Sequence, residues 1–386
     1  MSATDLGPLT GLRVLEVATL FAAPQVATML ADLGADVVKV EPPGGDPMRE
    51  MGQRRAGRSV AWEAIGRSKR SIVLDLSLEG ADREIFDGLV RAADVLVENL
   101  PASMRARWGC DYDELATRNE RLVVVSVSCY GRTGPYADRA GAGTLAEAHA
   151  GLTHMTGDPD GPPTLASVAI GDTLTAFAGV IGAVAACWSR DARGGPGRHV
   201  DVSMFEPVLA VMGGTIAGWD GEGPPPTRSG SRVHGGAPRN VYRTRDDRYV
   251  AVSGTTDTQV ARLLGLLGHD TAEHRERFGR AAARASAADD LDALVAAWIV
   301  ARDRDEVVEA LLEARIPVSP VNDLAELLAD PQVRARESLV MLDTGDGPVT
   351  IPAPVPSMSG TRRLPAPAPE LGADRDAVLA DWLDTT

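Results

Sequence analysis

Residues 11–41, GLRVLEVATLFAAPQVATMLADLGADVVKVE, decide the fold of this chain. Residues 11–17 are apolar and β-branched, which predicts a buried strand. Residues 24–33 follow the periodicity of a helix, and Gly34 is a typical residue to end one. Residues 36–41 predict a second strand, which the next prolines and glycines stop. A strand, a helix and a strand in this order form the repeating unit of a parallel sheet.

The same alternation continues outward from this stretch. Further strands are predicted at residues 71–76, 93–99, 121–128 and 199–205, and further helices at 79–92, 111–118 and 172–190. We therefore expect an α/β fold with a parallel sheet and helices on both of its faces. The last helix carries small residues that predict close packing in the core or against a second copy of the chain: Ala176, Gly179, Ala183 and Ala186.

The chain is expected to hold two domains. A large Rossmann-like domain takes residues 1–220, and the Gly/Pro-rich stretch 221–240 is a linker or an active-site loop. Residues 241–327 begin with a predicted hairpin and continue with amphipathic helices, which is typical of a smaller α+β domain. Residues 328–386 form a C-terminal segment that we expect to return to the large domain, with a helical stretch at 372–384.

The composition restricts the class of protein. The net charge is −15, which disfavours nucleic acid as a partner. We find no run of about 18 uncharged apolar residues and no basic segment before the first apolar stretch, so we expect neither a membrane span nor a signal peptide. Cys110, Cys129 and Cys187 lack the spacing of a metal site. We expect them to be buried in a reducing, cytoplasmic setting, and we expect no metal.

The turn after the first strand argues against a dinucleotide. In a dinucleotide-binding fold, an acid such as Glu41 after the second strand binds a ribose. Residues 18–24, ATLFAAP, contain no glycine, so the backbone cannot approach a pyrophosphate closely. A phosphate-binding loop of the ATPase kind is also missing. We therefore expect neither NAD nor ATP as a cofactor.

One segment is locally basic although the chain is acidic. Its residues either meet a ligand's phosphates or pair with the many acids of the surface, and the sequence leaves both open: Arg49, Arg54, Arg55, Arg58, Arg67, Lys69 and Arg70. Lys39 and Lys69 are the two lysines of the whole chain.

Six segments in the same order resemble those of the class III CoA-transferase family. They are residues 11–49, 67–77, 93–109, 126–141, 156–186 and 194–206. The family includes formyl-CoA transferase, carnitine CoA-transferase and α-methylacyl-CoA racemase. The resemblance implies a CoA-transferase that moves coenzyme A from an acyl-CoA to a carboxylic acid, folded as a Rossmann-like domain with a small domain. It also implies a homodimer in which the two chains interlock.

The resemblance further implies which residues form the site. Asp172, which follows Gly171 before the long apolar helix, matches the catalytic aspartate of the family. The implied CoA-binding residues are Thr19, Phe21, Ala22, Glu41, Pro42, Leu74, Leu76, Asn99, Leu100 and Arg107. The implied substrate or active-site wall is Ala142, Glu147, Met204, His234, Gly235 and Gly236, the two glycines as candidate donors to an oxyanion.

Spacing alone makes Asp172 an ordinary helix N-cap. On the resemblance it is a nucleophile that forms a mixed anhydride and then an aspartyl-CoA thioester, kept ionised by the helix dipole.

Two alternatives stay open. An acyl-CoA racemase of the same family would carry a histidine where this chain has Ala142, so the missing imidazole disfavours it. A non-catalytic acyl-CoA-binding relative, or a CoA-dependent lyase or hydrolase, is disfavoured by the presence of Asp172. The chain also lacks the polyglycine loop of formyl-CoA transferase, which argues against formyl and oxalyl substrates; residues 229–236 are the nearest glycine-containing stretch.

Overall fold

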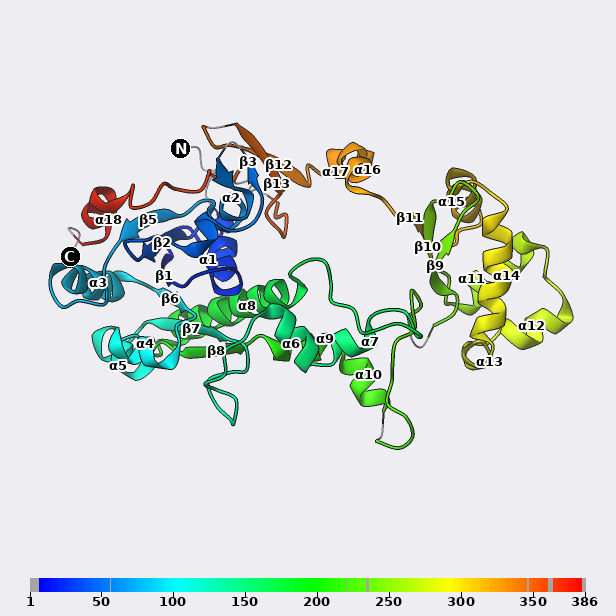
Figure 1. Cartoon of the computed structure of the whole chain (residues 1–386), viewed down its shortest axis with the longest axis horizontal. Helices are drawn as coiled ribbons and strands as arrows, with labels where there is room; N and C mark the ends of the chain where they lie inside the picture. Colours follow the sequence, from blue (N-terminus) through cyan, green and yellow to red (C-terminus); the bar gives the residue numbers. More distant parts are fainter. Residues whose placement is uncertain are drawn as a thin grey trace. The chain divides into compact units, whose positions relative to one another are not determined.

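The fold is taken from a computed structural model, which divides the chain into two compact units (Figure 1). The first unit takes Met1–Leu152, Leu165–Gly221 and Ala335–Thr386, and the second takes Thr153–Thr164 and Glu222–Arg334. The structure describes residues 7–55, 57–219, 221–233, 236–345, 347–359 and 364–383.

A six-stranded parallel sheet forms the centre of the first unit, in the order β5-β2-β1-β6-β7-β8. This confirms the predicted α/β class. The strands are β1 (Arg13–Val17), β2 (Asp36–Glu41), β5 (Arg70–Val73), β6 (Val95–Glu98), β7 (Val123–Ser128) and β8 (His199–Ser203). The predicted strands extend beyond the observed ones, most clearly at two ends: β5 ends before Leu74, and β8 ends before Met204, where the chain turns into a helix.

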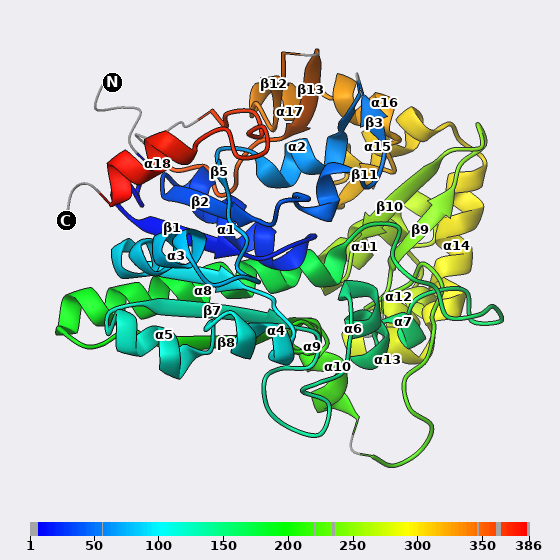
Figure 2. The same ribbon diagram turned by 60° about the vertical axis from the view of Figure 1, so that its left-hand side comes forward.

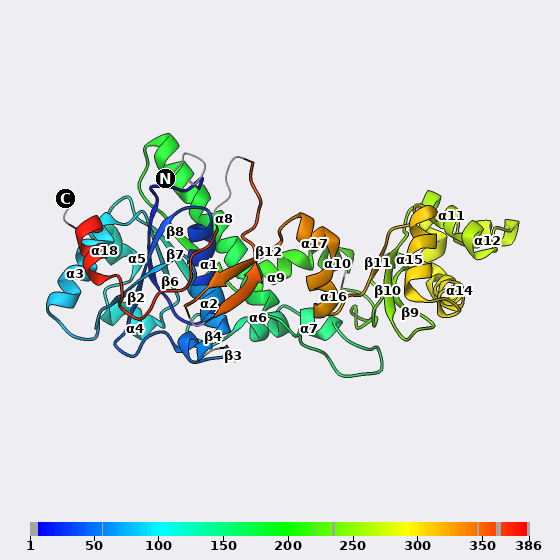
Figure 3. The same ribbon diagram turned by 90° about the horizontal axis from the view of Figure 1, so that it is seen from above.

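Helices cover both faces of this sheet (Figure 3). The helices α1 (Ala22–Asp32) and α8 (Ile170–Arg193) pack on one face. On the other face lie α3 (Ala81–Ala92), α5 (Tyr112–Arg118) and α18 (Arg375–Trp382). Neighbouring residues of a strand enter the two cores alternately, as Val14 and Leu15 do in β1, which is why these strands read as continuous apolar runs.

The small residues of α8 allow its close approach to α1. A Cβ added to Gly179 would lie 2.6 Å from a methyl carbon of Val26 in α1. Ala176, Gly179, Ala183 and Ala186 are all buried, so their predicted place in the core is confirmed.

The C-terminal segment completes the first unit. Helix α18 lies beside β5 (Figure 2). Trp382 is fully buried there, and its indole N–H donates to the Asp36 carboxylate at 2.7 Å. The remaining elements of this unit are η1 (Pro47–Arg49), β3 (Arg54–Arg55), β4 (Arg58–Ser59), α2 (Val60–Gly66), α4 (Ala102–Arg107), α6 (Gly143–His149), α9 (Phe205–Val211), α10 (Gly213–Gly218), β12 (Leu339–Asp343) and β13 (Pro348–Pro352).

The second unit is built on an antiparallel sheet in the order β11-β10-β9 (Figure 1). Its strands are β9 (Arg239–Arg243), β10 (Tyr249–Ser253) and β11 (Val318–Pro320), and β9 and β10 form the predicted hairpin. Its helices are α11 (Asp257–Leu267), α12 (Ala272–Phe278), α13 (Ala281–Ser286), α14 (Ala288–Val300), α15 (Arg304–Glu313) and α16 (Leu324–Ala329), while α7 (Leu152–Met155) and α17 (Pro331–Ala335) fall at the borders between units along the chain.

Helix α8 bears on the expectation that the chain has no membrane span. Within the described ranges it is the one helix that is long and apolar enough to cross a membrane, by length and composition only. Length and composition alone are weak evidence, because the core helix of a soluble protein passes the same test. Here α8 packs against α1 and the sheet, so we keep the interpretation as a core helix. The three cysteines are buried and unpaired, as predicted.

Candidate active site

The candidate site lies at the edge of the sheet where the parallel strands end. From β1 the chain passes to β2 and β5 on one side of β1, and it then returns to β6 on the other side. The direction of winding therefore reverses between β1 and β6. In open α/β sheets, ligands bind outside the carboxyl ends of the strands at such a reversal.

Hydrogen bonds between side chain and backbone join the ends of β1 and β6 at this point. The backbone N–H of Thr19 donates to Asn99 Oδ1 at 3.0 Å, and Asn99 Nδ2 donates to the Thr19 carbonyl at 2.9 Å. The next residue, Leu20, has a φ of 70°, which a residue with a side chain rarely adopts. The structure thus brings together Thr19 and Asn99, which the resemblance had assigned separately to a CoA site.

Glu41, at the end of β2, is committed to donors from the protein. Its carboxylate accepts from the Arg49 guanidinium at 2.7 and 2.8 Å, from Ser71 Oγ at 2.6 Å and from the Asp46 N–H at 3.0 Å. Burial alone would raise the pKa of Glu41, but these hydrogen bonds outweigh it and lower the pKa. The carboxylate therefore fixes the loop after β2.

The other predicted CoA residues differ in exposure. Leu74, Leu76 and Leu100 are buried, and they belong to the core under α3 and α18. Ala22 is buried at the start of α1, and Phe21 is half-buried before it. Pro42 and Arg107 are exposed.

The basic segment pairs mostly with acids of the chain. Its ion pairs are Arg49–Glu41, Arg54–Glu50, Arg58–Glu63, Arg67–Asp32, Lys69–Glu16 and Arg70–Asp36. Of the two roles that the sequence left open, the pairing with acids accounts for these residues.

Asp172 is the third residue of α8 and not its N-cap. The N-cap is Ala169, and no side chain makes a cap hydrogen bond there, so the prediction of a capping role was wrong. Asp172 lies in the first turn, where the helix dipole stabilises a negative charge. The pKa of its half-buried carboxyl is nevertheless raised, first by burial and then by the charge of Glu147.

Helix α6 approaches the start of α8 through two glycines. A Cβ on Gly143 would lie 2.1 Å from Asp172 Oδ2, and a Cβ on Gly171 would lie 2.7 Å from the Gly143 carbonyl oxygen. The buried Glu147 joins the same contact, because its Oε1 accepts from the Gly171 N–H at 2.9 Å. Sequence reasoning missed Gly143; the glycines in residues 141–143, GAG, were its only signal.

The end of β7 adds to the surroundings of Asp172, and β8 lies beside it. Cys129 follows β7, and its Sγ lies 3.8 Å from the Ala142 carbonyl oxygen. Burial raises the pKa of the Cys129 thiol, and the charge of Asp172 adds to this rise. Met204 follows β8; it is buried, and its N–H donates to the Ser128 carbonyl at 2.8 Å. Ala142 and Glu147 therefore lie on the helix-start region and helix that contact Asp172, while Met204 lies at the end of β8 beside β7.

The remaining wall residues stay predictions. His234 and Gly235 lie outside the described residues. Gly236 belongs to the second unit.

A pocket of about 350 Å³ opens in the first unit at the end of α6. The two carboxylates among its lining residues would repel a carboxylate ligand, so we do not assign the acceptor acid to it. It is lined by Tyr130, Gly131, Thr133, Pro135, Tyr136, His149, Asp201, Phe205 and Glu206. Among the described residues, no group of acids, histidines and cysteines could hold a metal ion.

Fold and site together define an α/β enzyme with a carboxylate at the ligand-binding edge of its sheet. The chain matches the profile of CoA-transferase family III over residues 9–375 and belongs to this family, so it is a class III CoA-transferase.

Curated relatives extend over almost the whole chain. It is 36% identical to the succinyl-CoA–D-citramalate CoA-transferase of Chloroflexus aurantiacus, over 98% of this chain and 95% of that protein. It is 34% identical to the succinate–glutarate CoA-transferase of Agrobacterium fabrum, over 97% and 95% of the two chains. It is 35% identical to the acetyl-CoA:oxalate CoA-transferase of Acetobacter aceti, over 86% of each chain.

Solved structures share the fold. A CaiB/BaiF family protein from Brucella suis has a TM-score of 0.83 and 33% identity, and the match covers 98% of this chain and 100% of that one. Rv3272 from Mycobacterium tuberculosis has a TM-score of 0.84 and 23% identity, over 97% and 99% of the chains, which bears on the fold alone.

Proposed function

We propose that Asp172 is the nucleophile with which this enzyme transfers coenzyme A between an acyl-CoA and a carboxylic acid. The observation that supports this proposal is the position of Asp172 in the structure. It combines a position in the first turn of α8, where an anion is stabilised, with a tight contact to Gly143 that fixes the direction of the carboxylate.

The first half of the reaction loads Asp172. A carboxylate oxygen attacks the thioester carbonyl carbon, the C–S bond breaks, and CoA leaves as the thiolate. The product is a mixed anhydride between Asp172 and the acyl group. The thiolate then attacks the Asp172 carbonyl carbon, which releases the donor acid and leaves an aspartyl-CoA thioester.

The second half reverses these steps with the acceptor. The acceptor carboxylate attacks the aspartyl thioester and again releases CoA thiolate. The thiolate attacks the acyl carbon of the new anhydride, which forms the product acyl-CoA and frees the Asp172 carboxylate. One thioester and one carboxylate stand on each side of the exchange, so no ATP is consumed.

We propose that the turn after β1 and Asn99 hold the CoA part of the substrate. The position supports this, because both lie at the reversal of the sheet. For the acyl part we propose a dicarboxylic acid, with succinyl-CoA as the first donor to examine. The support is that two curated relatives that extend over the whole chain are named for succinyl-CoA or succinate.

We also propose that the enzyme is a homodimer, with the two chains interlocked. Helix α8 supports an association, because one face of it leaves apolar side chains exposed: Phe177, Ile181, Val184 and Trp188. A mass of about twice 40.5 kDa in light scattering is expected, and a monomer contradicts the proposal. The cytoplasmic setting stays a prediction.

Trapping tests the nucleophile. The enzyme is incubated with succinyl-CoA, treated with hydroxylamine or borohydride, and mapped by mass spectrometry. A modified Asp172 is expected, and Asp172→Asn should abolish both adduct and transfer. The exposed Asp113→Asn, in the first turn of α5, is the matched control and should keep both. Full transfer by Asp172→Asn, without an adduct in the native enzyme, contradicts the proposal.

A further inference from the structure

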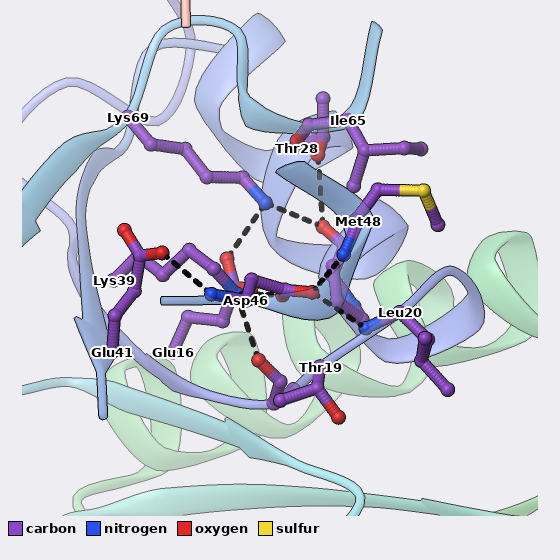
Figure 4. Close-up of polar contacts among 12 residues, drawn as sticks. Glu16, Thr19, Leu20, Thr28, Lys39, Glu41, Asp46, Met48, Ile65 and Lys69 are labelled. Carbon is purple, nitrogen blue, oxygen red and sulfur yellow. Dashed lines mark hydrogen bonds and ion pairs between the residues drawn. The ribbon is translucent and has the colours of Figure 1, made fainter. Parts of the chain in front are cut away.

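Four charged side chains lie buried together beside the turn after β1 (Figure 4). Glu16 and Lys39 are register partners on β1 and β2, Asp46 lies in the loop after β2, and Lys69 directly precedes β5. Their exposed fractions are 0%, 1%, 2% and 5%. Two ammonium groups and two carboxylates leave the set without net charge. We call these four residues the charged brace.

The ammonium group of Lys39 donates to Glu16 and to the backbone, and it forms an ion pair with Asp46. It lies 2.6 Å from Glu16 Oε1, 2.8 Å from Asp46 Oδ2 and 2.7 Å from the Ala18 carbonyl oxygen. Lys69 Nζ lies 2.7 Å from the other oxygen of Glu16, and it donates to the Pro24 carbonyl at 2.9 Å. Glu16 therefore joins both lysines.

The charged brace forms hydrogen bonds with backbone groups of the turn. The carbonyls that it binds, Ala18 and Pro24, stand on either side of the turn. Asp46 Oδ1 accepts from the Leu20 N–H at 3.2 Å and from the Met48 N–H at 2.9 Å. The bond to Leu20 fixes the residue whose φ is positive, while the Leu20 side chain is 43% exposed. Leu20 thus exposes its side chain to solvent, while its N–H is bonded to a buried carboxylate.

Stability alone does not explain this arrangement. Buried ion pairs lose much of their attraction to desolvation, and apolar side chains of similar volume often replace them without loss. Among lysine and arginine the chain uses arginine everywhere else, and its two lysines are both in the brace. A guanidinium spreads its donors along a planar fork, whereas an ammonium is a compact charge, and the ammonium of Lys39 lies 2.6 to 2.8 Å from three oxygens.

We propose that Glu16, Lys39, Asp46 and Lys69 are positioning residues that hold the turn at residues 18–22 in the conformation that binds CoA, without touching the ligand. This inference rests on the proposed CoA site at the same turn. It makes the affinity for CoA depend on side chains that the ligand does not reach.

Binding of free CoA, measured by calorimetry, tests the proposal. In Lys39→Met and Asp46→Ala the Kd for CoA should rise at least about tenfold, as expected for the loss of a charge-assisted hydrogen bond. The KM for acyl-CoA should rise equally, while kcat stays within about threefold, because Asp172 is not disturbed.

Two further variants separate positioning from stability. Asp46→Asn keeps an oxygen for Leu20 and Met48 and folds more readily, so its Kd should rise by less than in Asp46→Ala. Arg190→Met is the matched control. Arg190 is 3% exposed and pairs with Asp94 at 3.0 Å, but it lies 18 residues beyond Asp172 on α8. It should lower the melting temperature and leave Kd unchanged.

The outcomes are distinguishable. An unchanged Kd in folded Lys39→Met and Asp46→Ala overturns the positioning role, and so does an equal rise in Arg190→Met. If the native enzyme binds CoA and neither brace variant affects it, the proposed function stands and this inference fails. If the native enzyme binds no CoA or acyl-CoA, the proposed function itself fails.

Discussion

Two parts of the same sheet edge hold their loops by opposite means. At β1 and β2, four buried charges bind backbone groups of the turn. Around Asp172, the contact depends on two side chains that are missing, at Gly143 and Gly171. Charges fix the direction of donors and acceptors, and they adjust with pH. A glycine contact fixes volume, and it has no room for an added carbon. The charged region should therefore respond to charge and pH, and the glycine region to size.

The largest expected effect is on stability in the charged region. Glu16→Gln leaves two buried ammonium groups without their common carboxylate and should lower the free energy of unfolding by about 3–5 kcal/mol. The loss is measured by unfolding in urea. The double variant Glu16→Gln/Lys69→Met should lose less than the sum of its single variants, because it removes a charge of each sign. Additive losses would show that the four charges do not act as one brace.

A larger side chain in the glycine region should lower the catalytic rate. Gly143→Ala places a carbon against the Asp172 carboxylate, and a displacement of about 1 Å should lower kcat about 100-fold, or about 2.7 kcal/mol. The affinity for CoA should change less than threefold in the same variant. Gly213→Ala is the matched control, since a Cβ there meets no atom within 4 Å. A native kcat in Gly143→Ala would show that the close contact between Gly143 and Asp172 does not position the carboxylate.

Lys69 gives the charged region a specific pH dependence. Burial, opposed by Glu16 and increased by the charge of Lys39, lowers the pKa of Lys69 to about 8, against 10.5 in the unfolded chain. Between these two pH values the unfolded state binds more protons, so stability should rise with pH by roughly 2–3 kcal/mol. Lys39, whose pKa is raised, contributes a loss only above its ordinary value of 10.5. Urea unfolding at several pH values should show this rise in the native protein and not in Lys69→Met. An identical rise in both proteins would assign it to other groups.

The smallest expected effect is on the pH dependence of kcat/KM, which reports on Asp172 in the glycine region. Attack requires ionised Asp172, whose pKa is raised first by burial and then by Glu147. Glu147→Gln keeps an oxygen for the Gly171 N–H but removes the charge. The acid limb of kcat/KM should therefore move to lower pH. The exposed Glu84→Gln is the control and should leave the profile in place. A limb that moves to higher pH contradicts the assignment to Asp172.

The sequence predicted the strands and helices of the first unit well. Parallel strands are buried on both faces, so each one is a continuous run of apolar residues. The sequence missed the ends of β5 and β8, where the apolar run continues beyond the last ladder bond. The N-cap reading of Asp172 failed because the helix begins two residues earlier, at Ile170, after an Ala169 that no pattern marks as a cap.

The sequence predicted the site only where its residues follow a strand or precede a helix along the chain. The neighbours of Asp172 come from α6 and from the end of β7, and no periodicity connects these. The sequence did not predict the charged brace for a related reason. Lys69 stood in a run of arginines that looked like a surface cluster, and only the fold shows that it points to Glu16 on a different strand.

The burial of both lysines has a chemical consequence for an enzyme that handles acyl thioesters. Such thioesters also acylate free amines, and the folded chain offers no accessible lysine amine to them, with Lys39 and Lys69 only 1% and 5% exposed. The same property turns amine-reactive labels into a reporter of opening. In the folded protein both lysine amines are shielded, and each opening of the β1–β2 region exposes two amines whose modification mass spectrometry can count.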